Sequence, residues 1–139
     1  MSEQQRSSSS ADSTNVVAVR HVFKNYGDVE ALRDLSLDFP RGQLTSLLGP
    51  SGCGKTTLLK IIAGLLPATS GDVLVNDKPV TGPGPDRAFV FQDFALLPWA
   101  SVMRNVAFGL ELRGVEKSER EAIAAKYIAD VGLQGFEKS

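Results

Sequence analysis

Apolar and polar residues alternate along the first third of the chain, and this period of two predicts β-strands. Residues 16–22 are rich in valine and alternate in part, and residues 29–39 end in the alternating sequence Leu-Ser-Leu-Asp-Phe. Between them, residues 25–28 read Asn-Tyr-Gly-Asp, which is typical of a turn. We therefore expect two strands joined by a short turn.

Three shorter apolar runs predict further strands, and the first of them leads into a helix. The runs cover residues 44–48, 72–75 and 88–91. After the first run, leucine and isoleucine recur at helical spacing, and this helix is expected to stop near residues 64–67, which include glycine and proline. Residues 76–79, Asn-Asp-Lys-Pro, predict a turn after the second run.

Helical spacing dominates the last third of the chain. Ser101 is placed to cap a helix that extends to about Leu112, and Ser118-x-x-Glu121 has the pattern of a capping box for a second helix. Gly132 is expected to end this second helix. Its apolar face is predicted to comprise Ile123, Tyr127, Ile128 and Val131.

The clearest chemical signal lies between the apolar run 44–48 and the helix after it. Residues 49–57 read Gly-Pro-Ser-Gly-Cys-Gly-Lys-Thr-Thr and fit the phosphate-binding P-loop pattern G-x-x-x-x-G-K-S/T. Lys55 supplies a charge for the β- and γ-phosphates of a nucleotide, and the Thr56 hydroxyl is placed to ligate Mg²⁺. The predicted nucleotide-binding residues of the loop are Gly49, Pro50, Ser51, Gly52, Cys53, Gly54, Lys55, Thr56 and Thr57.

Composition limits the remaining possibilities. The 139 residues suggest one domain at most, and the net charge of −1, from 15 basic and 16 acidic residues, argues against nucleic acid as a partner. No apolar run approaches the roughly 18 residues that span a bilayer, and the N-terminus lacks the apolar region of a secretory signal. Cys53, the only cysteine, is either a reactive thiol that ATP would protect from alkylation or a small residue that fills the loop.

A P-loop enzyme also needs an acidic side chain near the Mg²⁺ ion and a group that orients the attacking water. Asp77 and Asp93 each follow an apolar run, and either would serve in a small self-contained kinase or NTPase. The alternative for Asp77 is a plain turn residue, because aspartate and asparagine are common in turns.

Several further blocks of sequence accompany the P-loop. They are Tyr26 with Ala31-Leu32, Gly71-Asp72-Val73, Val90-Phe91-Gln92, Leu96-Leu97-Pro98-Trp99 and Asn105-Val106-Ala107-Phe108-Gly109-Leu110. In this combination of blocks, the chain after about residue 15 resembles the ATP-binding subunits of ABC transporters. The last two blocks are most similar to those of the importers of nitrate, sulfonates and taurine.

The resemblance implies an α/β fold, that of a P-loop NTPase of the ABC type. In this fold, antiparallel β-structure at the N-terminus precedes the start of the nucleotide-binding core, which is expected to be incomplete here. It further implies the N-terminal part of the ATPase core at residues 15–100 and the start of a helical subdomain at residues 101–139. Residues 1–14 are rich in serine, glutamine and glutamate with almost nothing apolar, and this composition predicts a disordered tail.

Individual roles also follow from the resemblance. Tyr26 is expected to stack on adenine, the alternative being an ordinary turn tyrosine. Gln92 is assigned the catalytic position that contacts Mg²⁺ or the attacking water, the alternative being a polar residue that ends a strand. Asp93 then becomes a loop residue. A surface that meets the transmembrane permease is expected to include Phe94, Leu97 and Trp99, with burial in the local core as the alternative for the last two.

The sequence also departs from the family pattern. The family's Leu-Ser-Gly-Gly signature, its Walker B strand ending in Asp-Glu and its switch histidine do not occur in these 139 residues, so the general base is absent. His21, the only histidine, is expected to be an ordinary strand residue. We therefore expect a fragment, truncated within the helical subdomain, that binds ATP and Mg²⁺ but does not hydrolyse ATP by itself.

The function implied for the parent protein is ATP hydrolysis coupled to uptake of a small anionic solute such as nitrate, a sulfonate or taurine. Its expected partners are permease subunits, a second ATPase subunit in the full-length form and, indirectly, a periplasmic solute-binding protein. Its expected place is the cytoplasmic face of the cell membrane, as a peripheral protein. Two alternatives remain open: a small self-contained P-loop NTPase or kinase, and a non-catalytic nucleotide-binding fragment.

Overall fold

The computed structural model describes residues 14–139, which fold as two compact units, the first ending at Phe89 and the second covering Val90–Ser139. The disordered tail predicted for residues 1–14 lies outside the described residues except for Thr14, whose carbonyl accepts a hydrogen bond from the Arg41 N–H (3.0 Å). The division into a core part and a helical part at residue 100 remains a prediction. No helix among residues 14–139 is long and apolar enough to cross a membrane.

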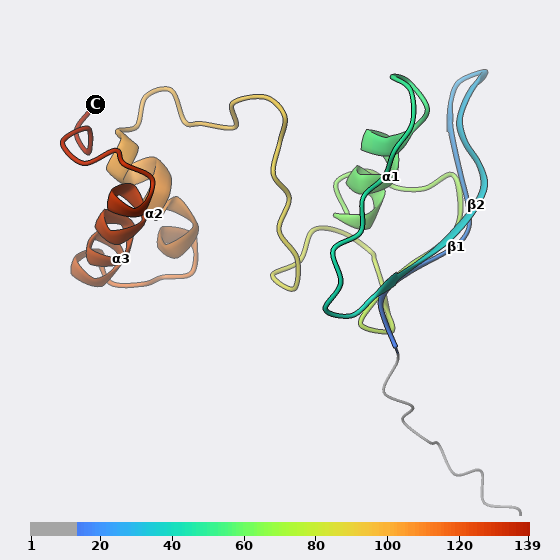
Figure 1. Ribbon diagram of the computed structural model, residues 1–139, viewed down its shortest axis with the longest axis horizontal. Helices are drawn as coiled ribbons and strands as arrows, with labels where there is room; N and C mark the ends of the chain where they lie inside the picture. The colour runs from blue at the N-terminus through green and yellow to red at the C-terminus, as the bar shows by residue number, and fades with distance from the viewer. Residues whose placement is uncertain (1–13) are drawn as a thin grey trace, which may run out of the picture. The chain divides into compact units, whose positions relative to one another are not determined.

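The first unit is built on a four-stranded antiparallel sheet with the strand order β2-β1-β3-β4. Figure 1 shows the long strands β1 and β2 running side by side. Strand β1 continues four residues beyond the predicted end at residue 22, because Lys24, Asn25 and Tyr26 still pair with β2 up to the turn of the hairpin. The hairpin predicted from the alternating pattern is confirmed. The strands are β1 (Asn15–Tyr26), β2 (Val29–Pro40), β3 (Ser70–Val75) and β4 (Lys78–Pro79).

The β1–β2 ladder is interrupted by a bulge around His21. His21 and Asp34 both have positive φ angles, 47° and 44°, and the pairing register shifts between Val19 and Val22. The His21 Nδ1 atom lies 2.7 Å from Asp34 Oδ1 on the exposed surface of the strands. His21 is therefore a strand residue, as expected, with the added role of shaping the bulge.

Helix α1 (Lys55–Ile62) packs on this sheet and closes its hydrophobic core. Leu58 and Ile61 lie one helical turn apart and are both buried, so the predicted helical spacing is confirmed. The helix ends at the glycine-containing segment that was expected to stop it, since Ala63 is its C-cap. The core cluster comprises Val19, Val22, Leu32, Leu58, Ile61 and Val73.

Two of the predicted strands do not form. Residues 44–48 are irregular, with Leu44 96% and Leu48 93% exposed, and residues 88–91 are irregular as well, with Val90 91% exposed. An apolar run becomes a strand only when neighbouring strands take up its backbone hydrogen bonds. Within residues 14–139 the sheet contains only the antiparallel strands β1 to β4, so neither run is part of a ladder. The prediction of strands for these two runs was wrong.

The second unit contains two helices that lie side by side, α2 (Val102–Leu112) and α3 (Lys117–Asp130) (Figure 1). The Ser101 side chain accepts a hydrogen bond from the Arg104 N–H (3.3 Å), so the predicted N-cap of α2 is confirmed. Gly132, with φ 74°, follows the last turn of α3 and confirms the predicted helix end.

Two details of α3 differ from the prediction. The helix begins one residue before Ser118, and its N-cap is Glu116, whose carboxylate accepts from the Ser118 N–H (3.1 Å). The acidic side chain takes the capping role because it reaches the same free N–H groups that a serine would. The buried positions of α3 are Ala124 and Ile128.

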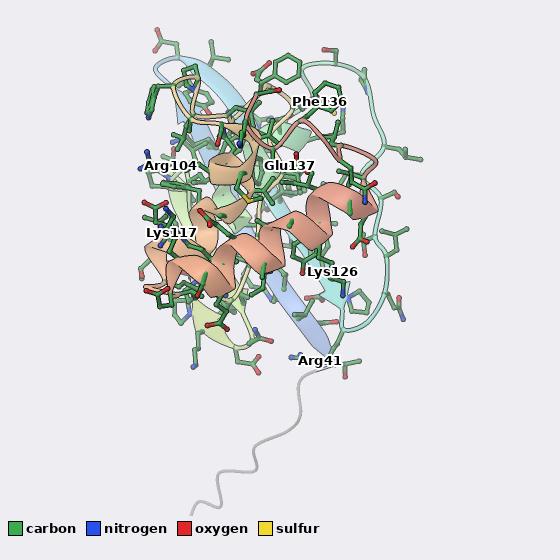
Figure 2. The ribbon with its side chains drawn as sticks, turned by 90° about the vertical axis from the view of Figure 1, so that its left-hand side faces the viewer. Arg41, Arg104, Lys117, Lys126, Phe136 and Glu137 are labelled. Atoms are coloured by element: carbon green, nitrogen blue, oxygen red, sulfur yellow. The ribbon has the colours of Figure 1, made fainter. Side chains whose placement is uncertain are left out.

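The exposed face of α3 is wider than its sequence suggests. Tyr127 is 59% and Val131 68% exposed, so the predicted apolar face was wrong for these two residues. Only a narrow stripe of α3 meets α2, because α2 is the one helix packed against it in this unit. Figure 2 shows Lys117 and Lys126 among the side chains that α3 presents outward. Glu111 of α2 pairs with Arg120 of α3 across this contact (3.8 Å).

Candidate nucleotide-binding site

The loop before α1 has the geometry of an anion site. The chain turns through residues 49–54 without regular structure, and α1 begins at Lys55. The N-cap is Gly54, which has no side chain to cap the helix, and no acidic residue lies in the first turn. The first N–H groups of a helix have no acceptor within the helix, and the helix dipole makes this end favourable for negative charge. This helix start is therefore suited to phosphate.

The Lys55 side chain is held over the P-loop by hydrogen bonds to backbone carbonyls of that loop. Its Nζ atom donates to the carbonyl oxygens of Gly49 (2.7 Å) and Pro50 (2.6 Å) and lies 3.4 Å from the sulfur of Cys53. A lysine ammonium has three donors, and here all three point into the turn formed by residues 49–54. The side chain thus brings a positive charge to the same place at which the helix presents its free N–H groups.

Gly54 has no room for a side chain. Its φ angle is 92°, and a Cβ atom there would lie 2.6 Å from Leu32 Cδ2 and 2.7 Å from the Ala31 carbonyl oxygen. Both neighbours belong to β2, so the last glycine of the P-loop is pressed against the hairpin. The sequence pattern of the P-loop requires a glycine here, and the close approach to β2 is a physical reason for it.

Tyr26 lies at the end of β1, next to the turn of the same hairpin, and is 50% exposed. Its ring is covered on one side by Lys24, whose Nζ atom lies 5.2 Å from the ring centroid. Lys24 also donates to the Pro67 carbonyl (2.8 Å), in the segment that follows α1. Thr69 strengthens this connection, since its N–H donates to the Phe23 carbonyl and its hydroxyl accepts from the Asn25 N–H (2.9 and 3.0 Å).

The first unit therefore brings most of the predicted site together. The hairpin that carries Tyr26 contacts the start of α1 through Leu32 and Gly54 and contacts the segment after α1 through Lys24. Sequence reasoning missed Lys24. The period of two along a strand places it two residues before Tyr26, and this spacing is the signal that would have found it.

The metal assignment rests on the chemistry of Thr56. Its side chain lies in the first turn of α1 and is exposed, whereas the neighbouring Thr57 is half-buried. A hydroxyl oxygen is a ligand that Mg²⁺ accepts, and in nucleotide sites this ion takes most of its other ligands from phosphates and water. Thr56 therefore fits a Mg²⁺ ion that arrives with a nucleotide.

The remaining predicted residues belong to other segments of the chain. Gln92 and Asp93 belong to the second unit, on an exposed irregular segment, and the predicted contact of Gln92 with the γ-phosphate or Mg²⁺ stays a prediction. Asp77, with φ 61°, lies in the exposed turn between β3 and β4. This agrees with the interpretation of Asp77 as a turn residue.

The exposed loop 94–100 of the second unit is organised by one side chain, Asn105 of α2. Its Oδ1 atom accepts from the Leu97 N–H (2.8 Å), and its Nδ2 atom reaches the carbonyls of Leu97 (3.2 Å), Ala100 (3.0 Å) and Ser101 (3.1 Å). Phe94 and Trp99 stand out from this loop, 95% and 77% exposed, while Leu97 is half-buried. The loop thus presents aromatic side chains on a fixed backbone.

A comparison with known families now places these features. The sequence profile of the ABC transporter family matches residues 32–139. The chain belongs to this family. Its α/β fold is accordingly that of an ABC-type P-loop ATPase, with the antiparallel sheet at the N-terminus, as the sequence predicted. This membership favours an ABC-type ATP-binding domain over a small self-contained kinase or NTPase.

Similar proteins agree with this assignment. An uncharacterised ABC transporter ATP-binding protein of Methanocaldococcus jannaschii is 53% identical over 113 residues, which are 81% of this chain and 42% of that protein. The taurine import ATP-binding protein TauB of Escherichia coli is 48% identical over 123 residues, which are 88% of this chain and 48% of TauB. The chain therefore spans about half the length of the curated relatives that it matches.

Solved structures show the same fold. The post-hydrolysis dimer of the ATP-binding cassette MJ0796, bound to ADP and Pi, has a TM-score of 0.76 at 28% identity and is matched over 88% of this chain and 60% of that chain. CbiO1 of Clostridium perfringens, part of the ABC transporter complex CbiONQ, has a TM-score of 0.71 at 26% identity, over 91% of this chain and 54% of that chain.

Proposed function

We propose that this chain forms the phosphate- and adenine-binding part of the ATP-binding subunit of an ABC importer. The observation that carries the proposal is the convergence on one helix start of the Lys55 ammonium, the uncapped N-terminus of α1 and the glycine loop. Thr56 supplies a ligand for Mg²⁺, and Tyr26 supplies a face on which adenine stacks. The structure of the related MJ0796 cassette with ADP and Pi supports nucleotide as the ligand.

The transported solute in this proposal is a small anion such as nitrate, a sulfonate or taurine. Support comes from the 48% identity with TauB, whose name assigns it to taurine import. In the proposed cycle, ATP hydrolysis by the full-length subunit drives uptake, and a periplasmic solute-binding protein delivers the solute. The subunit works at the cytoplasmic face of the cell membrane as a peripheral protein.

The proposed partners are the permease subunits and a second ATPase subunit. The loop 94–100 supports a permease contact, since exposed aromatic residues are enriched at protein interfaces and Asn105 holds the backbone of this loop in place. The contact residues in this proposal are Phe94, Leu97 and Trp99. Gln92, which precedes them, contacts Mg²⁺ or the attacking water and links nucleotide state to the permease.

The 139-residue chain by itself is proposed to bind ATP without hydrolysing it. No general base and no Walker B acid are present among its residues, and the signature motif that covers ATP in a dimer of the family is absent from them as well. Cradling of phosphates needs only the loop and helix of the first unit.

Calorimetric titration of the purified chain with Mg²⁺-ATP tests the proposal. We expect binding that Lys55→Ala weakens at least about tenfold, because a charge-assisted contact to phosphate is worth roughly 1.5–3 kcal/mol. Lys126→Ala, which removes an exposed charge from α3, is the matched control and should leave binding unchanged. Equal binding by the two variants contradicts the phosphate site, and turnover that depends on Lys55 contradicts the absence of hydrolysis.

The solute is tested in cells. Disruption of the gene that contains this sequence should abolish growth of the source organism on taurine as the only sulfur source, or on nitrate as the only nitrogen source. Growth on sulfate and ammonium should persist. Undiminished growth on all of these nutrients contradicts the proposed solute class but leaves the nucleotide site untouched.

A further inference from the structure

We propose that Lys24 is a positioning residue for the adenine site: it fixes the ring of Tyr26 and thereby raises affinity for the base of the nucleotide. The inference rests on the proposed role of Tyr26 and adds a residue to it. The observation is the location of Lys24 Nζ 5.2 Å from the centroid of the Tyr26 ring, together with its hydrogen bond to the Pro67 carbonyl.

Tyr26 has little else to hold it. It lies at the last position of β1, it is 50% exposed, and its backbone is paired with Val29 next to the turn of the hairpin. An exposed ring at a strand end changes rotamer readily, and ordering it on ligand binding costs free energy. A cation over one face restricts the ring and leaves the other face available to a base.

Lys24 is itself anchored. The residue is half-buried, and its ammonium group donates to the Pro67 carbonyl at 2.8 Å. The neighbouring Asn25 N–H donates to the Thr69 hydroxyl, and the Thr69 N–H donates to the Phe23 carbonyl. A flexible lysine would add little order to the ring, but one tied to the segment after α1 transmits the position of that helix to Tyr26.

This arrangement links the two parts of the proposed nucleotide site. The N-terminus of α1 contacts phosphate, and the segment that follows α1 holds Lys24 and, through it, the aromatic ring. The distance between ring and phosphate loop is then set by the rigid helix and by the hairpin that packs on Gly54. Lys24 therefore affects binding of the base and not of the phosphates.

A comparison of two probes, Mg²⁺-ATP and Mg²⁺-triphosphate, tests the proposal by calorimetry. Lys24→Met keeps the aliphatic stem and removes the charge. We expect it to weaken ATP binding about two- to fivefold, the magnitude of an exposed cation–π contact, and to leave triphosphate binding unchanged. Lys24→Arg, which retains a cation and a donor, should restore ATP affinity. Lys126→Met controls for loss of charge, and thermal unfolding of each variant controls for loss of fold.

A double-mutant cycle isolates the coupling between the two side chains. Because Lys24 acts through the ring, Lys24→Met should have no effect on ATP binding in a Tyr26→Ala background. Unchanged or tighter ATP binding by the single Lys24→Met variant, or an equal loss for triphosphate, overturns the proposal.

Failure of the underlying function gives a different result. If Lys55→Ala leaves triphosphate binding unchanged, the phosphate site itself is wrong. If Lys55→Ala weakens triphosphate binding but Tyr26→Ala leaves ATP binding unchanged, the adenine assignment is wrong, and the role of Lys24 is overturned with it. If both of these variants show a loss, and Lys24→Met either leaves ATP binding undiminished or weakens triphosphate binding as much as ATP binding, the role of Lys24 alone is overturned.

Discussion

The side-chain amide of Asn105 pairs with the backbone of Leu97 as a neighbouring strand would: it accepts from the Leu97 N–H (2.8 Å) and donates to the Leu97 carbonyl (3.2 Å). It also reaches the carbonyls of Ala100 and Ser101, at the start of α2. One half-buried side chain therefore supplies the hydrogen bonds that regular structure would otherwise provide to this loop. The exposed Trp99 is held on that backbone.

Asn105→Ala should destabilise the second unit by about 1–3 kcal/mol, because it leaves the Leu97 N–H and several carbonyls without their partner. Urea unfolding followed by the fluorescence of Trp99, the only tryptophan, measures the change at the affected loop. Gln134→Ala, at an exposed amide of the same unit, is the control and should stay within about 0.5 kcal/mol of the parent chain. Equal stability of the two variants would show that Asn105 does not organise the loop.

Gly54→Ala should abolish measurable nucleotide binding and lower stability by about 2–4 kcal/mol. The new Cβ would be forced against Leu32 and the Ala31 carbonyl at a φ angle that alanine disfavours. Gly52→Ala is the informative control. Gly52 has a φ angle of 81° but nothing within 4 Å of its Cβ position, so the loss of folding stability in this variant reports backbone strain without a clash against β2.

Thermal unfolding and calorimetric titration of both glycine variants separate the two effects. The difference in folding stability between Gly54→Ala and Gly52→Ala measures the contribution of the close packing of the P-loop on β2. Comparable losses in the two variants would attribute the requirement for glycine to backbone strain and not to the contact with β2.

Arg87→Ala should destabilise the first unit by about 1–3 kcal/mol. The Arg87 side chain is only 16% exposed, and it donates to the Ala63 carbonyl at the C-terminus of α1 (3.4 Å) and to the Gly82 carbonyl. A cation at this end of a helix also interacts favourably with the helix dipole. Hydrogen exchange of the α1 amides should accelerate in the variant.

Arg33→Ala provides the matched control for Arg87. Arg33 pairs with Glu30 on the surface of β2 and is 79% exposed, so its loss should change stability by less than about 1 kcal/mol. If hydrogen exchange in α1 accelerated equally in both variants, the capping role of Arg87 would be refuted.

Stability of the second unit should fall at acidic pH through Glu137. The backbone N–H groups of Glu137 itself and of Gly135 hold the pKa of the Glu137 carboxyl below its ordinary value. A group whose pKa is lower in the folded state contributes stability above its unfolded pKa and loses it as the pH falls through the folded pKa. The stability advantage of the parent chain over Glu137→Gln should therefore shrink below about pH 4.

Urea unfolding at several pH values checks this dependence. Figure 2 labels Glu137, which lies in the segment after α3. The Glu137 carbonyl accepts from the Met103 N–H of α2 (3.0 Å), so the change in stability should be detected at the start of α2. A difference between Glu137→Gln and the parent chain that stays constant from neutral pH to pH 3 would contradict the prediction.

The sequence predicted correctly those features that depend on interactions between residues close together in the chain. Ser101 caps α2, Gly132 ends α3, and the hairpin β1–β2 forms from an alternating pattern around a glycine turn. The P-loop motif placed Lys55 at the first turn of a helix, and the structure has it there. In each case the interaction spans a few residues, so neighbours in sequence determine it.

Tertiary structure alone decided which apolar runs become strands and which side chains meet. Residues 44–48 and 72–75 are both short apolar runs, but only the second pairs with β1. A strand forms only where a neighbouring strand pairs with it, and the sequence of the run does not determine that partner or the register of the pairing. The contacts of Lys24 with Pro67 and of Gly54 with Leu32 join segments more than 20 residues apart. The motif thus identified the phosphate loop, whereas the contacts of Gly54 with Leu32 and of Lys24 with Pro67 determine how the hairpin that carries Tyr26 is held against α1 and the segment after it.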